Sequence, residues 1–536
     1  MPAHVARART SPGTGSALVI DTSPEAVARH LEDAAHFPGG HADAVARPRS
    51  EAEVSALVGA SARVLTVGAH SSVTGGATPD GGLVLSTERL TTIHESGQGQ
   101  IRVGAGVPLD TLQKLLHRGG RWYAPIPTFT GAFVGGVVST NAAGAATFKY
   151  GATRAWVDGL TVVLACGDVL DLERGAVIAH PEHGFEIVCL HGTRHVHPGT
   201  YRMPAVPKCS AGYFAAPGMD LVDLFIGSEG TLGVIVDATL RVLPEPPAIA
   251  LALVPVPSEA TAIALVDDLR RASALTWRNR DRRGIDVSAI EHLDRRCLEL
   301  LREDGADRRN NIGIREDAEL VLIVQLELPA GMDAAHAYAD VSGVFLPEAP
   351  DSPLVRFCRL LAHHGVFDDT ELALPGDETR AAQFLAFREA APTGVNRRVG
   401  DAKRLVDARI EKTAADMIVP FDRFGEMMRG YREGYARRGL DYAIWGHISD
   451  GNVHPNVIPK TYADVVAGRD AILEFGREVA ALGGCPLAEH GVGRSAIKQA
   501  LLRQLYGDAA IGEMRAIKTA LDPDWKLAPG VIFNRH

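Results

Sequence analysis

The chain has 536 residues, 46% of them apolar, and a formal net charge of −10 at pH 7. A chain of this length is too long for one hydrophobic core and should divide into two or three domains. The acidic balance argues against nucleic acid and anionic membranes as partners, because both favour a basic surface. No run of about 18 apolar residues occurs, so we expect no transmembrane segment.

The six cysteines and the N-terminus bear on the cellular compartment. None of the cysteines stands in a C-x-x-C motif, which excludes an iron–sulfur or disulfide framework and suits a reducing compartment. The first ten residues carry charge, but no apolar segment follows them, so we expect no secretory signal. These features predict a cytoplasmic protein.

The first part of the chain predicts an irregular start, a short helix from Pro24 to Ala35 and a second helix opened by Ser50. Strands are expected at 63–67 and 82–86, and the segment Gly68 to Gly76 between them consists of small residues. Such a loop lets backbone N–H groups turn towards an anion such as a phosphate. It is neither a Rossmann fingerprint, since no helix follows directly, nor a P-loop, since Gly-Lys-Ser/Thr is absent.

Two further stretches of small residues, 123–151 and 223–235, would let a large flat ligand lie against the backbone. Between them, residues 172–215 form a polar insertion with five histidines, which we expect to be a solvated loop rather than a metal site, because the spacing is irregular. Pro244 to Pro247 form a stiff boundary. Beyond it, 250–420 predicts an α+β domain, with strands at 250–254 and 320–326 and a helix from Ser258 to about Ala272.

The stretch 445–456 predicts a β-hairpin, because Asp450-Gly451 favours a two-residue type I′ turn. That turn would place His447 opposite His454, with their Cβ atoms about 4.5–5.5 Å apart. Two imidazoles on one face suit a divalent metal, and Glu489 is the expected third ligand of an open, catalytic site. His490 is left as an acid or base. The alternative is that both histidines lie on the surface beside an ordinary turn.

Several motifs resemble those of a known family. Gly68 to Gly76, Pro-x-Pro-Thr at 125–128, Gly-Gly-x-x-x-Thr-Asn-Ala from Gly135, Lys-Tyr-Gly-x-x-Arg ending at Arg154, and Gly-Ser-Glu-Gly-Thr-Leu-Gly from 227 resemble the vanillyl-alcohol-oxidase (PCMH) type of FAD-binding domain. Gly-His-x-x-Asp-Gly-Asn-x-His-Pro-Asn and Glu-His-Gly-x-Gly resemble the C-terminal domain of FAD-linked D-2-hydroxy-acid dehydrogenases, which act on D-lactate, D-2-hydroxyglutarate or glycolate. The resemblance covers about residues 44–536.

The resemblance implies an α+β fold with a two-subdomain PCMH-type FAD-binding domain and an α+β cap. The implied domains are an N-terminal extension at 1–43, the FAD-binding domain at 44–246, the cap with the metal site at 247–490, and a C-terminal segment at 491–536 that returns to the FAD domain. The residues implied to contact FAD are Val67, Gly68, Ala69, His70, Ser71, Ser72, Gly75, Gly76, Pro127, Thr128, Gly135, Gly136, Ser139, Asn141, Gly144, Ile235, Asn456 and Asn534.

The implied reaction is FAD-dependent oxidation of a D-2-hydroxy acid to the 2-oxo acid, with hydride transfer to flavin N5. Arg388, expected at a helix end, and Lys412 would bind the substrate carboxylate. Arg397, Arg398 and Lys403 are competitors for the role of Lys412. A metal on His447, His454 and Glu489 would bind the 2-hydroxyl, and His490 would accept its proton. Zinc suits these ligands, and manganese or iron would also fit.

Several alternatives stay open at this point. His70 stands where some relatives carry a histidine joined covalently to the flavin, so covalent attachment is one of them. The electron acceptor is oxygen, a quinone, a cytochrome or an electron-transfer flavoprotein, a peripheral location at the inner membrane is an alternative to the cytoplasm, and a homodimer is an open possibility. The rival functions are a metal-dependent hydrolase and a non-redox FAD enzyme such as an ether-lipid synthase.

Overall fold

The computed structural model describes residues 4–13, 18–95, 97 and 99–535. The chain divides into two compact units, which we call the first and the second unit. The first unit comprises Met1–Gly144, Gly151–Pro244 and Cys485–His536, and the second comprises Ala145–Tyr150 and Glu245–Gly484. The chain therefore enters the second unit briefly at 145–150, crosses into it at Pro244, and leaves it at Gly484.

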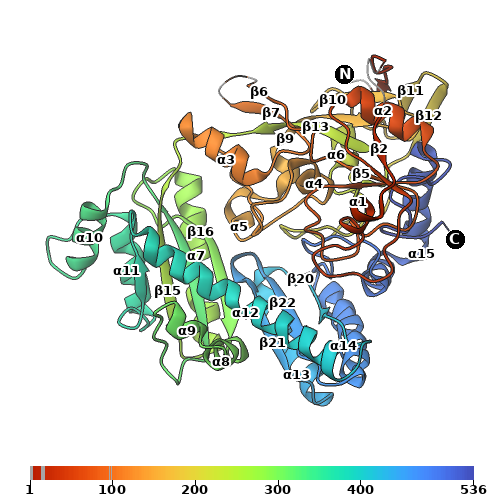
Figure 1. The fold of residues 1–536 in the computed structure, drawn as a ribbon. Helices are drawn as coiled ribbons and strands as arrows, with labels where there is room; N and C mark the ends of the chain where they lie inside the picture. The colour runs from red at the N-terminus through yellow and green to blue at the C-terminus, as the bar shows by residue number, and fades with distance from the viewer. Residues whose placement is uncertain (1–3, 14–17, 96, 98, 536) are drawn as a thin grey trace. The chain divides into compact units, whose positions relative to one another are not determined.

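The first unit contains two main sheets (Figure 1). The smaller has the order β2 (Ile20–Asp21), β3 (Ala44–Ala46), β5 (Leu83–Ser86) and β4 (Val64–Val67), with β3, β5 and β4 parallel. The larger is antiparallel, with the order β10 (Val169–Glu173), β9 (Val157–Val163), β13 (Val234–Arg241), β7 (Gln100–Gly104) and β6 (Ile93–Glu95). Helix α2 (Glu51–Ala60) shares one apolar core with both sheets. Val54 of the helix, Leu85 of β5 and Val163 of β9 belong to this core.

The N-terminal part of the first unit is more ordered than the sequence predicted. Strand β1 (Val5–Arg7) pairs in parallel with β11 (Phe185–Cys189), and β11 pairs with β12 (Gly192–Val196). The expectations of an irregular start and of a loop throughout 172–215 were therefore wrong. The N-terminal strand β1 and the strands β11 and β12 of the 172–215 stretch form one sheet. Helix α1 (Pro24–Ala28) is shorter than expected and ends before Ala35.

The remaining elements of the first unit surround these sheets. They are α3 (Leu109–Arg118), β8 (Arg121–Trp122), α4 (Val134–Ser139), η1 (Thr153–Trp156), α6 (Leu221–Phe225), β14 (Leu243–Pro244) and α15 (Ala496–Leu521). The C-terminal segment runs beside β4, because the N–H of Val64 donates to Lys526 O at 2.8 Å and the N–H of Ala528 donates to Val64 O at 2.8 Å. Residues from both ends of the sequence thus complete one unit.

The second unit is built on one antiparallel sheet. Its order is β18 (Glu371–Ala373), β15 (Ala248–Val256), β17 (Leu320–Leu328), β16 (Val287–Asp294), β21 (Tyr442–His447), β22 (Asn452–Val457) and β19 (Thr413–Ala414), and β20 (Met417–Ile418) also pairs with β22. The strands predicted at 250–254 and 320–326 are present and longer. The sheet brings β16 next to β21, although about 150 residues separate them in sequence.

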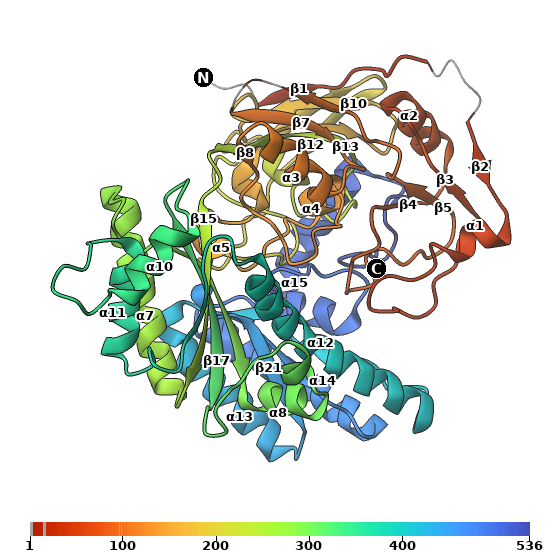
Figure 2. The same cartoon turned by 60° about the vertical axis from the view of Figure 1, so that its left-hand side comes forward.

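Helices cover this sheet. They are α5 (Thr147–Tyr150), α7 (Glu259–Asn279), α8 (Arg295–Glu303), α9 (Ala306–Arg309), α10 (Ala334–Ser342), α11 (Pro353–His363), α12 (Glu378–Leu405), η2 (Phe421–Arg423), α13 (Phe424–Arg437), η3 (Ile448–Asp450) and α14 (Tyr462–Ala481). Helices α8 and α12 pack on one face through Leu298, Phe384 and Phe387 (Figure 2). Ser258 caps α7 as expected, since its side chain accepts from Thr261 N.

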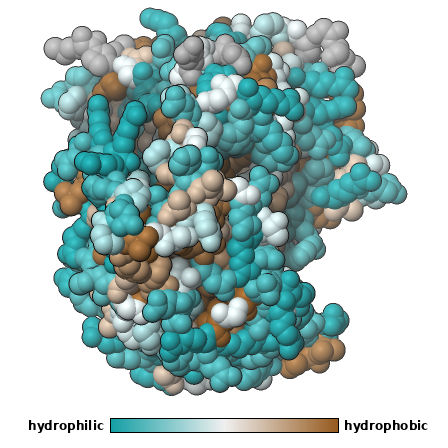
Figure 3. All heavy atoms as spheres, turned by 90° about the vertical axis from the view of Figure 1, so that its left-hand side faces the viewer, coloured by the Kyte–Doolittle hydropathy of each residue, from teal (hydrophilic) through white to brown (hydrophobic). Residues whose placement is uncertain are grey.

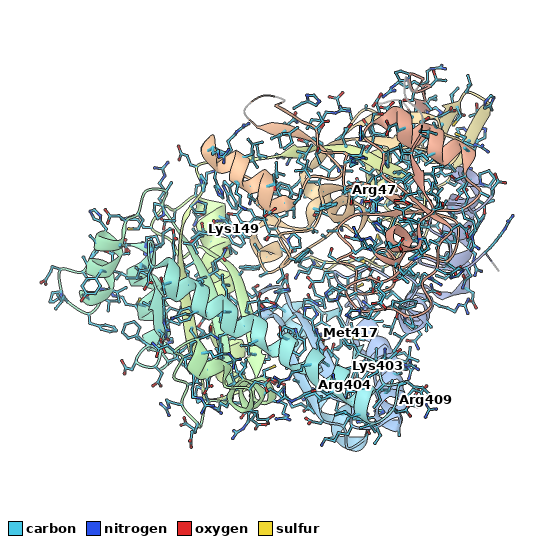
Figure 4. The ribbon with its side chains drawn as sticks, in the orientation of Figure 1. Arg47, Lys149, Lys403, Arg404, Arg409 and Met417 are labelled. Atoms are coloured by element: carbon cyan, nitrogen blue, oxygen red, sulfur yellow. The ribbon has the colours of Figure 1, made fainter. Side chains whose placement is uncertain are left out.

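The short helix α5 is held in the second unit by charged side chains. Lys149 Nζ donates to Asp286 Oδ2 at 2.8 Å and to Glu327 Oε2 at 2.6 Å, and Tyr150 donates its hydroxyl to the same Glu327 oxygen at 2.6 Å. Trp277 Nε1 donates to the other oxygen of Asp286 at 2.7 Å. Figure 4 labels Lys149 on this segment. These bonds explain why 145–150 belongs to the second unit although its sequence neighbours belong to the first.

Figure 3 shows one face on which hydrophilic residues predominate, with apolar residues in small groups. Among the described residues, none of the helices combines the length and the apolar character that a membrane crossing requires.

Candidate functional site

The hairpin of β21 and β22 carries both expected metal-binding histidines. His447 pairs with Asn452, and His454 pairs with Trp445, so the predicted pairing of His447 with His454 was wrong. The turn is longer than two residues: η3 forms a single 3₁₀ turn that Gly451 closes with φ of 85°. The register is shifted by two residues, which preserves the face of each side chain. The two rings therefore still meet, with centroids 5.6 Å apart and planes nearly perpendicular.

A carboxylate lies beside the Nδ1 atom of each histidine. Glu291 Oε1 on β16 is 2.8 Å from His447 Nδ1, and Asp416 Oδ1 is 3.4 Å from His454 Nδ1. Asn452 fixes Asp416 by donating from Nδ2 to Oδ1 at 3.1 Å. At His447, the carboxylate holds the proton on Nδ1 and leaves Nε2 as the donor atom for a metal ion. Both rings are almost completely buried, so the donor set fits a divalent cation.

Arg388 lies in the interior of α12, so its predicted position at a helix end was wrong. Helix α12 continues through Pro392 to Leu405. The guanidinium is buried and already paired: Nε donates to Glu291 Oε2 at 3.0 Å, and Nη1 donates to Glu389 Oε1 at 2.7 Å. Burial opposes ionisation of Glu291, but the Arg388 charge and the hydrogen bonds from His447 and Arg388 outweigh it and lower the Glu291 pKa to about 2.

The two lysines considered for the second cationic contact lie in different places. Lys412 is exposed in the segment between α12 and β19. Lys403 is exposed in the last turn of α12, where Figure 4 shows it beside Arg404. Neither position decides which lysine contacts a substrate, so the role of Lys412 stays a prediction.

Glu489 and His490 belong to the first unit. Glu489 is largely buried, and Lys208, whose side chain has no exposed surface, reaches Glu489 Oε2 at 3.0 Å. His490 Nε2 lies 3.6 Å from Glu489 Oε1, and about a third of the His490 side chain is exposed. The sequence singled out Glu489 and His490 but assigned no role to Lys208, which lies 281 positions away along the chain.

Glu229 fixes the segment that follows His490. Its carboxylate accepts from the N–H groups of Val492 and Gly493, each at 2.8 Å. A Cβ on Gly493 would lie 2.2 Å from Thr74 Oγ1, so only glycine fits there. Burial raises the pKa of Glu229. The Gly-Ser-Glu-Gly motif therefore anchors the Glu489 segment to the first unit, a role that the sequence did not suggest.

The loop from Gly68 to Gly76 follows β4 and suits a phosphate. In the described part of the chain, the N–H groups of Ala69, His70 and Ser71 donate no hydrogen bond, and these residues are at least partly exposed. His70 has φ of 54°, which turns successive N–H groups towards one side. Asp33 secures the loop by accepting from Gly75 N at 2.7 Å. Available donors on a fixed loop are what the FAD pyrophosphate requires.

The other residues implied to contact FAD lie on several elements, and some have a structural role as well. Gly135 is buried against Ala105, where a Cβ would come within 2.7 Å, and Gly144 lies against Ile126 O. Asn141 accepts from Arg154 N at 2.9 Å. Asn456 is buried on β22, and Asn534 is exposed near the C-terminus. Whether each of these residues touches the cofactor stays a prediction.

His70 is held by a second histidine. His30 Nδ1 lies 2.7 Å from His70 Nε2, and Arg47 Nη2 lies 3.2 Å from His30 Nε2. A guanidinium only donates, so His30 Nε2 accepts and His30 Nδ1 donates to His70. Burial lowers the pKa of His30 to about 4, which keeps this ring neutral. The Nε2 lone pair of His70 is therefore engaged, and Nδ1 carries the proton of the neutral ring.

Comparisons with known proteins agree with this architecture. The family described as "FAD linked oxidases, C-terminal domain" matches residues 256–532, more than half of the chain, and an FAD binding domain matches residues 42–173. The fold and the small-residue loops thus define an FAD-binding oxidoreductase. The chain belongs to the FAD-linked oxidase family, as the sequence resemblance predicted.

The relatives include enzymes with named substrates. D-2-hydroxyglutarate dehydrogenase of Xanthomonas citri pv. viticola is 29% identical, with 92% of this chain and 89% of the relative covered. D-lactate dehydrogenase of Archaeoglobus fulgidus is 26% identical, with 92% and 91% covered. A solved structure of alkyldihydroxyacetonephosphate synthase has a TM-score of 0.56 at 14% identity, with 95% of this chain and 82% of that chain covered, which supports the fold alone.

These findings confirm the predicted fold class and FAD as the cofactor. The alternative of a metal-dependent hydrolase without a flavin loses its basis, because the chain belongs to a flavoprotein family. The metal and the particular substrate stay proposals.

Proposed function

We propose that the protein oxidises the 2-hydroxyl of a small D-2-hydroxy acid to a 2-oxo acid, with FAD as the electron acceptor. The observation that carries this proposal is the pair His447 and His454, each with a carboxylate beside Nδ1. This arrangement favours Nε2 as a metal donor. The relatives named for D-2-hydroxyglutarate and D-lactate support the substrate class.

The proposed metal ligands are His447, His454 and Glu489. A divalent cation, when bound, supplies a Lewis acid that favours the deprotonated form of a hydroxyl group. Two imidazoles and one carboxylate suit zinc, with manganese and iron as alternatives. Lys208 would keep the Glu489 carboxylate ionised and oriented, because it provides a buried positive charge at 3.0 Å.

The protein's other side chains would bind and orient the substrate. Arg388 would bind the carboxylate, sharing its guanidinium between the substrate, Glu291 and Glu389. Lys412 would add a second positive charge. His490 would accept the hydroxyl proton at its ring nitrogen, since imidazole accepts protons near neutral pH. FAD, when bound on the loop from Gly68 to Gly76, supplies the acceptor for the hydrogen and electron pair leaving the 2-carbon.

An anaerobic screen tests the reaction. The purified protein is mixed with D- and L-lactate, D- and L-2-hydroxyglutarate and glycolate, and the visible flavin band is followed while metal content is measured on the same sample. We expect a D-2-hydroxy acid to bleach the band. A flavin band that none of these acids bleaches contradicts the proposal and favours a non-redox flavoprotein. Adding oxygen, a quinone, a cytochrome or an electron-transfer flavoprotein to the reduced protein then identifies the second acceptor.

Two variants test the metal site. His454→Ala should keep FAD and lose reduction by the substrate, together with its metal. His336→Ala, which replaces an exposed histidine on α10 in the same unit, should match the wild type. Undiminished bleaching in metal-free His454→Ala would rule out the metal's role.

A further inference from the structure

Four of the six cysteines lie in two pairs within the first unit. Cys209 Sγ is 3.6 Å from Cys485 Sγ, although 276 positions separate them in sequence. Cys166 and Cys189 form the other pair, with ligand atoms within 4.8 Å of each other and of Asp168. Both pairs belong to the first unit, and all four residues are thiols. Neither pair could be recognised from the sequence, because no two cysteines are close along the chain.

The Cys209 and Cys485 pair joins the two segments that carry Lys208 and Glu489. Ser210 N donates to Leu487 O at 2.9 Å, so the backbones of these segments are in direct contact. The Cys485 thiol donates to Leu487 O at 3.2 Å. The ion pair between Lys208 and Glu489 joins the same two segments. A change at the two sulfurs therefore acts on the segment that presents Glu489 and His490.

The two sulfurs are close enough to be joined by oxidation. A disulfide has sulfurs about 2.05 Å apart, so the two atoms need to approach by about 1.5 Å. Cys209 is partly exposed and Cys485 is fully buried. Cys209 is thus the residue that a reagent meets first, and Cys485 is placed to resolve the product.

We propose that Cys209 and Cys485 are a thiol modification site that a small-molecule disulfide such as glutathione disulfide oxidises to an intramolecular disulfide. In the first step, the Cys209 thiolate attacks one sulfur of the reagent, the reagent's S–S bond breaks, and one thiol leaves with the Cys209 proton. In the second step, Cys485 attacks the Cys209 sulfur and expels the second thiol, which takes the Cys485 proton. Two protein thiols lose two electrons, and one reagent disulfide becomes two thiols.

The disulfide would lower the activity. It draws the Lys208 and Glu489 segments together at one end, and a displacement of about 1 Å at a reacting group can cost about 100-fold in rate. We expect at least a tenfold loss that dithiothreitol reverses. This consequence rests on the proposed function, whereas formation of the disulfide does not.

The experiment treats the FAD-bound protein with glutathione disulfide and maps its peptides without reduction. The expected result is a peptide that joins Cys209 to Cys485, which disappears after dithiothreitol. Persistence of both thiols, or a glutathione adduct on Cys209 that Cys485 never resolves, overturns the proposal. Because the map detects the bond directly, a negative result here is distinct from a protein that oxidises no 2-hydroxy acid.

Two variants separate this pair from the other one. Cys209→Ser should retain basal activity and become resistant to glutathione disulfide, with its visible flavin spectrum showing that it is folded. Cys166→Ser is the matched control and should remain as sensitive as the wild type. If Cys166→Ser is protected and Cys209→Ser is not, the regulatory pair is Cys166 and Cys189, and the assignment to Cys209 is wrong.

Discussion

The Nδ1 atom of His447 lies 2.8 Å from Oε1 of Glu291, its partner on the adjacent strand of the sheet. The second oxygen of the same carboxylate accepts from Arg388 at 3.0 Å. Glu291 therefore connects the histidine proposed for the metal to the arginine proposed for the substrate. Because the carboxylate holds the Nδ1 proton, Nε2 of His447 keeps its lone pair for a cation.

Replacing Glu291 with Gln should weaken metal binding about 10- to 100-fold, because the amide holds the ring less firmly and no longer raises its basicity. The measurement is metal content after dialysis against a graded series of chelator concentrations. FAD content should not change. Glu389→Gln is the matched control, since Glu389 also pairs with Arg388 but is half exposed. Equal metal loss in both variants would show that metal binding depends on the pairing with Arg388 and not on the contact with His447.

The hairpin shows what the sequence could and could not predict. The motif identified the turn and the face shared by His447 and His454, since these depend on local pattern and on the two-residue period of a strand. It missed the register of the two strands, because a 3₁₀ turn closed by Gly451 connects them in place of a two-residue turn. The contacts of Glu291 and Lys208 could not be predicted, since the sheet order and the fold of the first unit bring them to their partners from 156 and 281 positions away.

The same distinction holds elsewhere in the fold. The helix capped by Ser258 and the two strands β15 and β17 follow local patterns and were predicted, although their ends extend further. Helix α12 continues through Pro392, where tertiary packing of Phe384, Phe387 and Val395 outweighs the lost hydrogen bond. Strand β1 was missed because its partner β11 is about 180 residues away.

FAD should be released completely when the protein is precipitated with acid. The Nε2 atom of His70 accepts from His30, so the neutral His70 ring carries its proton on Nδ1 and has no lone pair available for a bond to the flavin. The measurement is flavin fluorescence in the supernatant and in the denatured pellet. Fluorescence that remains with the polypeptide would show a covalent bond and would contradict the hydrogen-bond assignment.

The stability of the second unit should fall between pH 7 and pH 5, in part because of His292. Burial lowers the pKa of this histidine from 6.5 to about 4. Below pH 6.5 the unfolded chain binds a proton that the folded chain does not, so stability is present above pH 6.5 and is lost as the pH falls towards 4. From pH 7 to pH 5 the loss is about 2 kcal/mol.

Urea denaturation of His292→Gln at both pH values measures this contribution. The variant should lose less stability on acidification than the wild type, by about 2 kcal/mol. His336→Gln replaces an exposed histidine of the same unit and should keep the pH dependence of the wild type. An unchanged pH dependence in His292→Gln would mean that folding does not lower the pKa of this ring.

Gly446→Ala should abolish the proposed reaction while FAD stays bound. Gly446 has φ of 146°, and a Cβ there would lie 2.7 Å from the Cα of Val453 and 3.2 Å from Cδ2 of His454. Since the Val453 backbone belongs to β22, the strand has to move and the His454 ring moves with it. Gly439→Ala is the matched control, because Gly439 also has a positive φ of 62° but has open space around it. Only about 1–2 kcal/mol of stability should be lost in that variant.

Anaerobic flavin reduction by a D-2-hydroxy acid should fall at least tenfold in Gly446→Ala and remain normal in Gly439→Ala. Normal reduction in both variants would show that the position of His454 does not limit the reaction.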